Sequence, residues 1–175
     1  MNKAIKIILK GIFMKLIKSR KPRNLMNIYR LYLKSFPKNE RKPFPFILLK
    51  QWRGTTEVLS IRNSKGEFLG LAITALQNNL ALIAYFAVSS EKRGTGIGSK
   101  ALQLLRERYS DKKIFLEIEN TETESENKEE RKKRKNFYLK NGMLEMPFII
   151  NFFGTEMEVL TYNSPVTFEE YHSIY

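Results

Sequence analysis

Hydrophobic and polar residues follow two different periods along this chain, and together they predict a mixture of helices and strands. Apolar residues recur at helical spacing over 24–36, 46–52 and 96–109, and a charged helix ends near residue 140. Strand-like segments lie just after Met14 and at 58–62, 68–76, 80–88, 113–118, 143–153 and 156–162. This order predicts an α+β fold built from a meander, a βαβ crossover and a hairpin. Asn24 is a candidate N-cap for the first helix.

The segment 80–88, LALIAYFAV, is a nearly continuous apolar run, as expected for a central strand buried on both faces. It leads into a loop with three alternating glycines, which opens directly into a helix. Glycines at such a turn let backbone N–H groups converge on an anion, and the positive end of the helix dipole suits a pyrophosphate. The glycines alone are also compatible with a simple flexible turn.

Two common phosphate-binding motifs do not fit this loop. A P-loop requires a Lys followed by Ser or Thr after the glycines, and the chain has none there. A Rossmann fingerprint requires a doubly wound parallel sheet, whereas a meander of at least three strands precedes these glycines.

Composition narrows the chemistry further. The 175 residues suffice for one compact domain, and 42% of them are hydrophobic. The chain has no cysteine, which excludes disulfides, thiolate metal sites and a cysteine nucleophile. The single histidine, His172, cannot form a multi-histidine metal site. The remaining groups for chemistry are backbone amides, carboxylates, hydroxyls, phenols and amines, and we expect no metal.

The positive charge is concentrated in the first third of the chain. Residues 1–53 contain 10 Lys and 5 Arg against one acid, Glu40, for a net charge of +14. Residues 54–175 contain 16 basic and 17 acidic side chains, for a net charge of −1. This asymmetry favours a polyanionic partner, namely nucleic acid, an anionic membrane surface or a phosphate-rich ligand. A basic surface that only keeps the protein in solution is the alternative.

Residues 1–13 form a separate segment in this interpretation. Their pattern is that of a basic amphipathic helix, too short and too charged to span a bilayer. Because Met14 is a second plausible start, we expect the segment to be a translated leader, a membrane-surface helix or a packing helix. The expected domain then covers 14–162, and 163–175 form a C-terminal tail.

The glycine loop also carries a family resemblance. Arg93-Gly94-Thr95-Gly96-Ile97-Gly98 resembles the R/Q-x-x-G-x-G/A signature of the GCN5-related N-acetyltransferases (GNAT). The segment 136–143, NFYLKNGM, is similar to the family's second signature, and the segment 35–43, SFPKNERKP, resembles a segment of a bacterial subgroup. Three such segments in this order make the resemblance strong, and it runs from about Met14 to Tyr162.

The resemblance implies the acyl-CoA N-acyltransferase fold, with a mixed, mostly antiparallel sheet of about six to seven strands and flanking helices. It also implies acetyl-CoA as co-substrate, with its pyrophosphate wrapped by the loop. The residues expected to bind it are Phe86, Ala87, Val88, Arg93, Gly94, Thr95, Gly96, Ile97, Gly98 and Ser99. The first three lie where the family's central strand splays from its neighbour, and the Val88 N–H is the expected oxyanion donor.

Within the resemblance, Tyr138 of the second signature is the expected general acid, because a phenol is protonated at neutral pH. A core tyrosine is the alternative. Glu40 is the favoured general base, with Glu117 and Glu119 as alternatives, and His172 is interpreted as a tail residue.

The second signature departs from its common form. Arg131 and Arg134 stand where the family usually has an Asn and a small residue. Cationic side chains there could reach CoA phosphates, but a solvated charged helix face is the preferred interpretation.

The expected function is transfer of the acetyl group from acetyl-CoA to a primary amine of a small molecule or peptide, by direct attack. We expect a bacterial, cytoplasmic enzyme that is a monomer or homodimer, without a transmembrane segment. The alternatives are a non-catalytic acyl-CoA-binding sensor and a basic nucleic-acid or membrane-surface module. Nucleic acid is disfavoured because Tyr29, Tyr32 and Phe36 lie at core spacing rather than at exposed sites.

Overall fold

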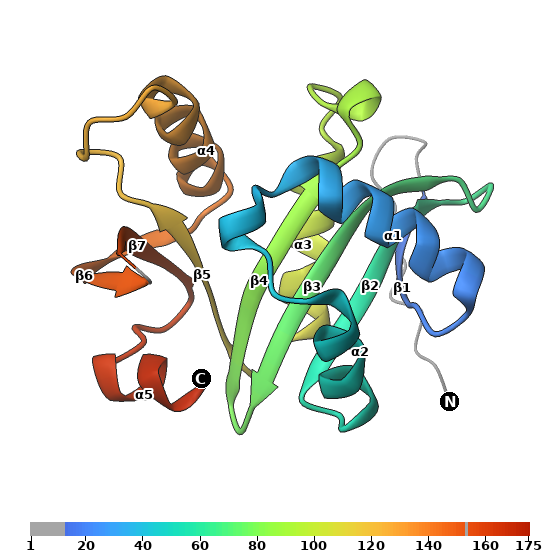
Figure 1. The fold of residues 1–175 in the computed structure, drawn as a ribbon, viewed down its shortest axis with the longest axis horizontal. Helices are drawn as coiled ribbons and strands as arrows, with labels where there is room; N and C mark the ends of the chain where they lie inside the picture. Colours follow the sequence, from blue (N-terminus) through green and yellow to red (C-terminus); the bar gives the residue numbers. More distant parts are fainter. Residues whose placement is uncertain (1–12, 153) are drawn as a thin grey trace. The chain divides into compact units, whose positions relative to one another are not determined.

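The computed structural model describes residues 13–152 and 154–175. Seven strands are hydrogen-bonded in the order β1-β2-β3-β4-β5-β7-β6. β4 and β5 pair in parallel, whereas β1–β2, β2–β3, β5–β7 and β6–β7 are antiparallel. This mixed sheet with flanking helices confirms the predicted α+β fold (Figure 1). Of the segment 1–13, residues 1–12 lie outside the described residues.

The chain divides into two compact units. Unit 1 comprises residues up to Leu76 together with Ala84–Arg108, and unit 2 comprises Gln77–Ile83 together with Tyr109–Tyr175. The boundary passes through β4, which gives its first four residues to unit 2 and the rest to unit 1.

Unit 1 follows the predicted order of strands and helices. Its elements are β1 (Met14–Lys18), α1 (Pro22–Ser35), η1 (Lys38–Glu40), α2 (Phe44–Trp52), β2 (Thr56–Asn63), β3 (Phe68–Gln77), β4 (Leu80–Val88), η2 (Ser90–Lys92) and α3 (Ile97–Arg108). The predicted hairpin between β2 and β3 is present, with the Gly66 N–H donating to the Asn63 carbonyl at 3.0 Å.

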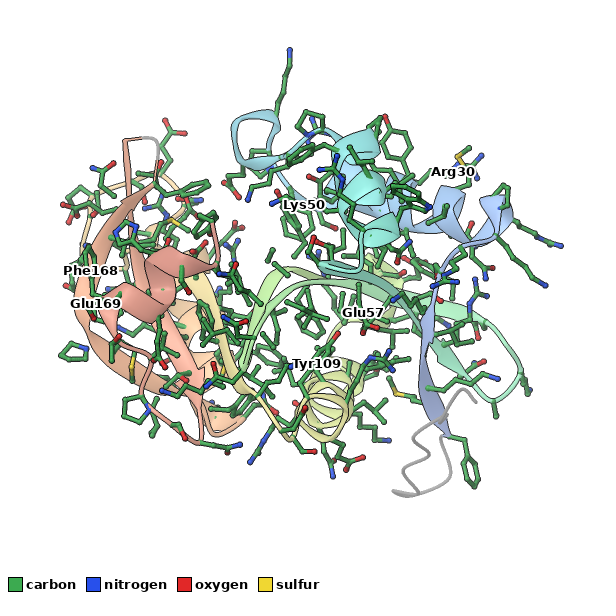
Figure 2. All side chains as sticks on the ribbon, turned by 90° about the horizontal axis from the view of Figure 1, so that it is seen from below. Arg30, Lys50, Glu57, Tyr109, Phe168 and Glu169 are labelled. Atoms are coloured by element: carbon green, nitrogen blue, oxygen red, sulfur yellow. The ribbon has the colours of Figure 1, made fainter. Side chains whose placement is uncertain are left out.

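The two faces of the unit 1 strands are covered by different helices, as Figures 1 and 2 show. On one face, α1 and α2 pack against the strands through a buried cluster of Ile28, Leu31, Tyr32, Phe44, Ile47, Val58, Leu71, Ile73, Tyr85 and Ala87. On the other face, α3 packs through Met14, Ile61, Leu69, Ile97, Ala101 and Leu104. β4 contributes Tyr85 and Ala87 to the first cluster, and its Phe86 and Val88 pack against the second. The end of β4 is therefore covered on both faces, which explains its continuous apolar run.

The start of α1 differs from the prediction. The helix begins at Pro22, with Lys21 as N-cap, because proline suits the first helical turn. The Asn24 side chain instead accepts a hydrogen bond from the Arg62 guanidinium at 2.9 Å. The predicted N-cap role of Asn24 is therefore wrong.

Unit 2 consists of the first residues of β4 and the second half of the chain. Its other elements are β5 (Lys113–Glu119), α4 (Lys128–Lys140), β6 (Leu144–Phe152), β7 (Thr155–Tyr162) and α5 (Phe168–Ser173). β7 lies between β5 and β6, so the last hairpin pairs with β5 through its second strand.

Helix α5 was not predicted from the sequence. Thr167 and Glu170 form a capping box at its start, and Lys113 Nζ forms an ion pair with Glu170 at 2.7 Å. The Tyr171 ring packs against Phe115 of β5, with ring centroids 6.3 Å apart. The segment after Tyr162 is thus partly helical and joined to the core of unit 2.

An ion pair fixes the end of α3 in unit 1. Arg108 donates to both carboxylate oxygens of Glu57 on β2, at 2.7 and 2.9 Å, and Lys18 of β1 contacts the same carboxylate at 3.3 Å. Glu57 is buried, so neutralising its carboxylate would leave partly buried cations without a countercharge (Figure 2 labels Glu57).

We predict that Glu57→Gln lowers the free energy of unfolding by about 3 kcal/mol, the lower end for breaking a buried ion pair. For a domain of this size the melting temperature should fall by about 6–12 °C. Glu67→Gln is the matched control, because it removes the exposed Glu67–Lys92 ion pair and should leave the melting temperature nearly unchanged. Equal melting temperatures for the two variants would contradict the role of Glu57.

Candidate functional site

The glycine loop connects β4 to α3 in unit 1. Gly94 and Gly96 adopt positive φ angles of 75° and 80°, a left-handed conformation that other residues adopt only with strain. A Cβ atom built on either glycine would meet no atom of the described chain within 4 Å. The glycines are therefore required by backbone conformation, and the space beside them is open.

The loop leads into the N-terminus of α3. Ile97, 6% exposed, anchors the first turn in the core, and the Lys100 N–H donates to the Gly96 carbonyl at 3.1 Å as the helix begins. Helix geometry leaves the first backbone N–H groups without intrahelical acceptors, and these belong to Ile97, Gly98 and Ser99. Gly94, Thr95, Gly96 and Ser99 are exposed. The open space, the donors and the dipole fit an anionic group such as a pyrophosphate.

Arg93 and Thr95 stabilise the loop. The Arg93 Nε–H donates to the Val88 carbonyl at 3.4 Å, and the Thr95 hydroxyl donates to the Lys92 carbonyl at 2.7 Å. The Ser89 N–H donates to the Leu69 carbonyl of β3 at 2.9 Å. The exposed Arg93 guanidinium thus lies beside the end of β4 and within the glycine loop.

Glu40 lies at the end of η1, and its backbone is fixed to β4 by Tyr85. The Tyr85 hydroxyl donates to the Glu40 carbonyl at 2.9 Å and accepts from the Lys42 N–H at 3.0 Å. The Tyr32 hydroxyl donates to the Lys42 carbonyl at 2.9 Å, and burial raises its pKa well above the ordinary value. Unit 1 therefore brings the backbone around Glu40 against the strand that enters the glycine loop. Sequence reasoning missed Tyr85, because its hydrogen-bond partners lie 43 and 45 residues away along the chain.

Tyr138 lies in the last turn of α4, in unit 2. It is 7% exposed, and burial raises the pKa of its phenol to about 12, against a lowering effect of the Arg134 charge. The proton therefore stays on the phenol across the neutral range. This state fits both the predicted general acid and a core tyrosine.

Ion pairs hold α4 on the strands of unit 2. Arg131 donates to Glu119 of β5 at 2.6 Å, and Arg134 lies 3.6 Å from the same carboxylate. The preferred interpretation of Arg131 as part of a solvated face is wrong, because its side chain is largely buried against Glu119. Glu119 is thereby occupied in an ion pair, which disfavours it as a general base.

A second ion pair lies further along the same helix. Lys135 contacts Glu158 of β7 at 2.5 Å and Glu145 of β6 at 3.1 Å. Burial alone would raise the pKa of Glu158, but hydrogen bonds from Lys135 and from Thr121 outweigh burial and lower it. The charged form of Glu158 is therefore favoured, and it ties α4 to the end of β5.

The other two titratable candidates lie near α5. Glu117 of β5 accepts a hydrogen bond from the Tyr175 hydroxyl at 2.6 Å. Burial, followed by the neighbouring Glu117 charge, raises the pKa of Tyr175 well above its usual value. The His172 ring stacks edge-on against Phe168, with centroids 4.4 Å apart. The predicted residues are thus divided: 86–99 and Glu40 belong to unit 1, whereas Tyr138, Glu117, Glu119 and His172 belong to unit 2.

Within 13–152 and 154–175, no cluster of three or more His, Cys, Asp or Glu side chains could hold a metal ion. No helix in the described part of the chain has the length and apolar character needed to cross a membrane.

The strand order and the glycine loop at the start of α3 define an acyl-CoA N-acyltransferase fold. A model of the acetyltransferase (GNAT) family matches residues 25–143, which is more than half of the chain. The chain therefore belongs to the GNAT family of acetyltransferases. No curated protein sequence matches it significantly.

Solved structures of similar fold include two from named bacteria. A protein of Bacteroides thetaiotaomicron assigned to the GNAT family superposes with a TM-score of 0.75, at 19% identity, over 92% of this chain and 92% of that chain. Spermidine N-acetyltransferase from Vibrio cholerae, solved with CoA and spermine, superposes with a TM-score of 0.65, at 13% identity, over 85% of this chain and 94% of that one. At such identities the likeness shows the fold alone.

We predict that Tyr85→Phe lowers the free energy of unfolding by about 2 kcal/mol, since it removes two hydrogen bonds worth about 1 kcal/mol each. The melting temperature should fall by about 4–8 °C, and backbone amides around Lys42 should exchange hydrogen faster. Tyr29→Phe is the control, because Tyr29 is partly exposed on α1 of the same layer. Unchanged exchange around Lys42 in Tyr85→Phe would contradict the proposed tether.

Proposed function

We propose that this acetyltransferase transfers the acetyl group of acetyl-CoA to a primary amine by direct attack of the amine on the thioester. The observation that carries this proposal is the exposed left-handed glycine turn at the N-terminus of α3, with Arg93 beside it. Membership of the GNAT family supports the same chemistry.

In the proposed donor site, the backbone N–H groups of residues 94–99 bind the pyrophosphate and the Arg93 guanidinium adds a positive charge. The open space next to Gly94 and Gly96 supports this assignment, because a bulky anion needs room there. The backbone of Phe86, Ala87 and Val88 binds the pantetheine arm, and the Val88 N–H stabilises the charge that develops on the carbonyl oxygen.

In the proposed reaction, the amine nitrogen forms a bond to the thioester carbonyl carbon and the carbon–sulfur bond breaks. Glu40, directly or through a water, accepts the proton that the amine loses. Tyr138 gives its phenolic proton to the departing thiolate. A pKa of about 12 keeps this proton in place at neutral pH but also makes the phenol a weak acid, so its contribution should lie at the low end for general acids.

The proposed acceptor is an amine that also carries an acidic or phosphorylated group. The segment from Pro37 to Pro43 next to Glu40 contains Lys38, Arg41 and Lys42, and these cations would repel a polyamine. The Vibrio cholerae neighbour was solved with spermine, so a polyamine is a direct comparison substrate. Thiol release measured with a panel of amines tests both turnover and acceptor charge, and no release with any amine would favour an acyl-CoA sensor.

We predict that acetyl-CoA stabilises the folded protein. At a concentration about 100-fold above Kd, the gain should be roughly 2.7 kcal/mol, because the ligand binds only the folded state. The melting temperature should rise by about 5–10 °C. The absence of any shift at saturating acetyl-CoA would contradict the proposed donor site.

Gly96→Asp should abolish this thermal shift, since it places a negative charge where the pyrophosphate binds. Gly66→Asp is the matched control: Gly66 has a φ of 81° and open space around it, but lies in the β2–β3 hairpin. Both variants should lose similar stability without ligand, and only Gly66→Asp should keep the shift.

We predict that Tyr138→Phe lowers kcat by about 100-fold, since the variant keeps the ring but removes the proton donor. Acetyl-CoA affinity should change by less than about 1 kcal/mol, the scale of one neutral hydrogen bond. Steady-state kinetics with the best amine of the panel, and binding of acetyl-CoA measured separately, provide the two values.

Tyr162→Phe serves as the control for loss of a buried hydroxyl, because Tyr162 is a buried tyrosine of the same unit. It should retain turnover. Wild-type kcat in Tyr138→Phe would remove Tyr138 from the mechanism, and water or the amine's own proton would then protonate the thiolate.

A further inference from the structure

Helices α1 and α2 present large apolar side chains to the outside. Within unit 1 both helices cover the same face of the strands, and their buried sides form one cluster. Their opposite sides leave six large apolar residues partly or largely exposed: Met26, Tyr29, Leu33, Phe46, Leu49 and Trp52. The core position expected for Tyr29 is therefore wrong, because its side chain is 37% exposed. We call these six residues the α1–α2 face. Trp52 is 83% exposed, which is unusual for a tryptophan, and exposed apolar patches commonly mark an interaction site.

Cations share the same sides of the two helices. On α1, the exposed Met26 lies four residues before Arg30, and the exposed Tyr29 lies directly before it. Met26, Tyr29 and Arg30 therefore occupy one stripe of the helix. On α2, Lys50 has the same relation to Leu49 and Phe46, and its Nζ atom lies 5.2 Å from the centroid of the Phe46 ring. Figure 2 labels Arg30 and Lys50, which lie on the two helices on the same side of the unit 1 strands.

The surrounding chain is strongly basic. From Lys18 to Arg53 there are 11 Lys and Arg residues against the single acid Glu40, and neither α1 nor α2 contains an Asp or Glu. An apolar stripe bordered by cations and free of acids is the pattern of helices that lie in the interface of an anionic bilayer.

We propose that the α1–α2 face docks onto an anionic lipid bilayer, with Trp52, Phe46 and Leu49 inserted at the level of the headgroups. Lys50, Arg53 and Arg30 then contact the lipid phosphates. Tryptophan favours this depth because its ring is apolar and its indole N–H is a polar hydrogen-bond donor. The helices lie on the membrane, in keeping with their short length.

Other occupants fit the face less well. Nucleic-acid interfaces are polar, and the aliphatic Met26, Leu33 and Leu49 would have no partner on a phosphate backbone. In a symmetric dimer formed through this face, the cations of one subunit would lie close to the cations of the other. Neither helix has an acidic residue that could pair with them, so the dimer would be disfavoured by repulsion. The bilayer satisfies the apolar and the cationic side chains at the same time.

Trp52 provides a direct readout, because it is the single tryptophan of the chain. The full chain is mixed with phosphatidylcholine vesicles with or without about 40 mol% phosphatidylglycerol, which supplies the negative surface potential. We expect a blue shift of the tryptophan emission, and quenching by lipids brominated near the headgroup, with the anionic vesicles only. Added salt should weaken binding, since the attraction acts over about one Debye length.

Two pairs of variants separate the apolar and electrostatic contributions in a vesicle flotation assay. Phe46→Ser with Trp52→Ser should abolish flotation, whereas Leu144→Ser with Ile149→Ser, which removes two exposed apolar side chains of β6, should not. Lys50→Gln with Arg53→Gln should weaken binding about 30-fold, or about 1 kcal/mol for each charge removed.

Lys65→Gln with Lys133→Gln makes the same charge change at exposed sites outside α1 and α2, and should leave binding nearly unchanged. Thermal melts of each variant exclude loss of fold as the cause.

Four outcomes would overturn the proposal. The first is an absent blue shift with anionic vesicles, and the second is equal binding to phosphatidylcholine alone. The third is a blue shift in the absence of vesicles. If it increases with protein concentration, the face binds a second copy of the chain, and if it requires added oligonucleotide, the face binds nucleic acid. The fourth is full flotation of Phe46→Ser with Trp52→Ser, which would assign membrane binding to another part of the chain.

Discussion

The reversal of the chain between β4 and α3 is the constraint on which the donor site depends. β4 ends at Val88 and α3 begins at Ile97, so the chain must turn sharply while its backbone N–H groups stay accessible. Positive φ angles at Gly94 and Gly96 make this turn without strain. The start of α3 is fixed by the buried Ile97 and its end by the pair of Arg108 with Glu57, so the loop connects β4 to a helix that is anchored at both ends. A loop anchored in this way presents its donors already oriented, which lowers the entropic cost of binding a phosphate.

Helix α4 is held by a different interaction. Its sequence, KEERKKRKNFYLK, is almost entirely charged in the first two turns, and Tyr138 is the residue that the fold buries. Apolar packing therefore contributes little to the position of the first turns, and the pairs of Arg131 with Glu119 and of Lys135 with Glu158 replace it. Lys135 lies about one turn before Tyr138, and Arg131 lies about two turns before it. The two ion pairs therefore fix the position of the helix that carries the phenol.

The sequence predicted the elements better than the contacts between them. The apolar run of β4, the glycines after it and the helical spacing of α1 to α3 are local signals, and each predicted element is present, although α1 and α2 begin two residues earlier than predicted. Arg62, the partner of Asn24, lies 38 residues away, and Glu119, the partner of Arg131, lies 12 residues before it on a different element. No helical or strand periodicity indicates either contact. Tyr85 and Gly70 were missed for the same reason: a Cβ on Gly70 would lie 2.4 Å from the Ala87 carbonyl oxygen, a close approach visible only once β3 lies beside β4. Helix α5 is only six residues long, and its capping box was the signal that sequence reasoning overlooked.

The basic first third of the chain has consequences for the proposed chemistry as well as for docking. The stretch from Lys18 to Arg53 has 11 Lys and Arg residues against one acid, so it repels protonated amines and slows the approach of cationic acceptors. An anionic bilayer held against α1 and α2 would neutralise much of that potential and would itself concentrate protonated amines in its counterion layer. An acceptor with its own acidic group would need no such compensation, because the basic segment from Pro37 to Pro43 attracts it directly. The same cations would therefore bind the lipid phosphates and attract an acidic acceptor. Binding to a bilayer should shift the preference of the enzyme towards more cationic amines.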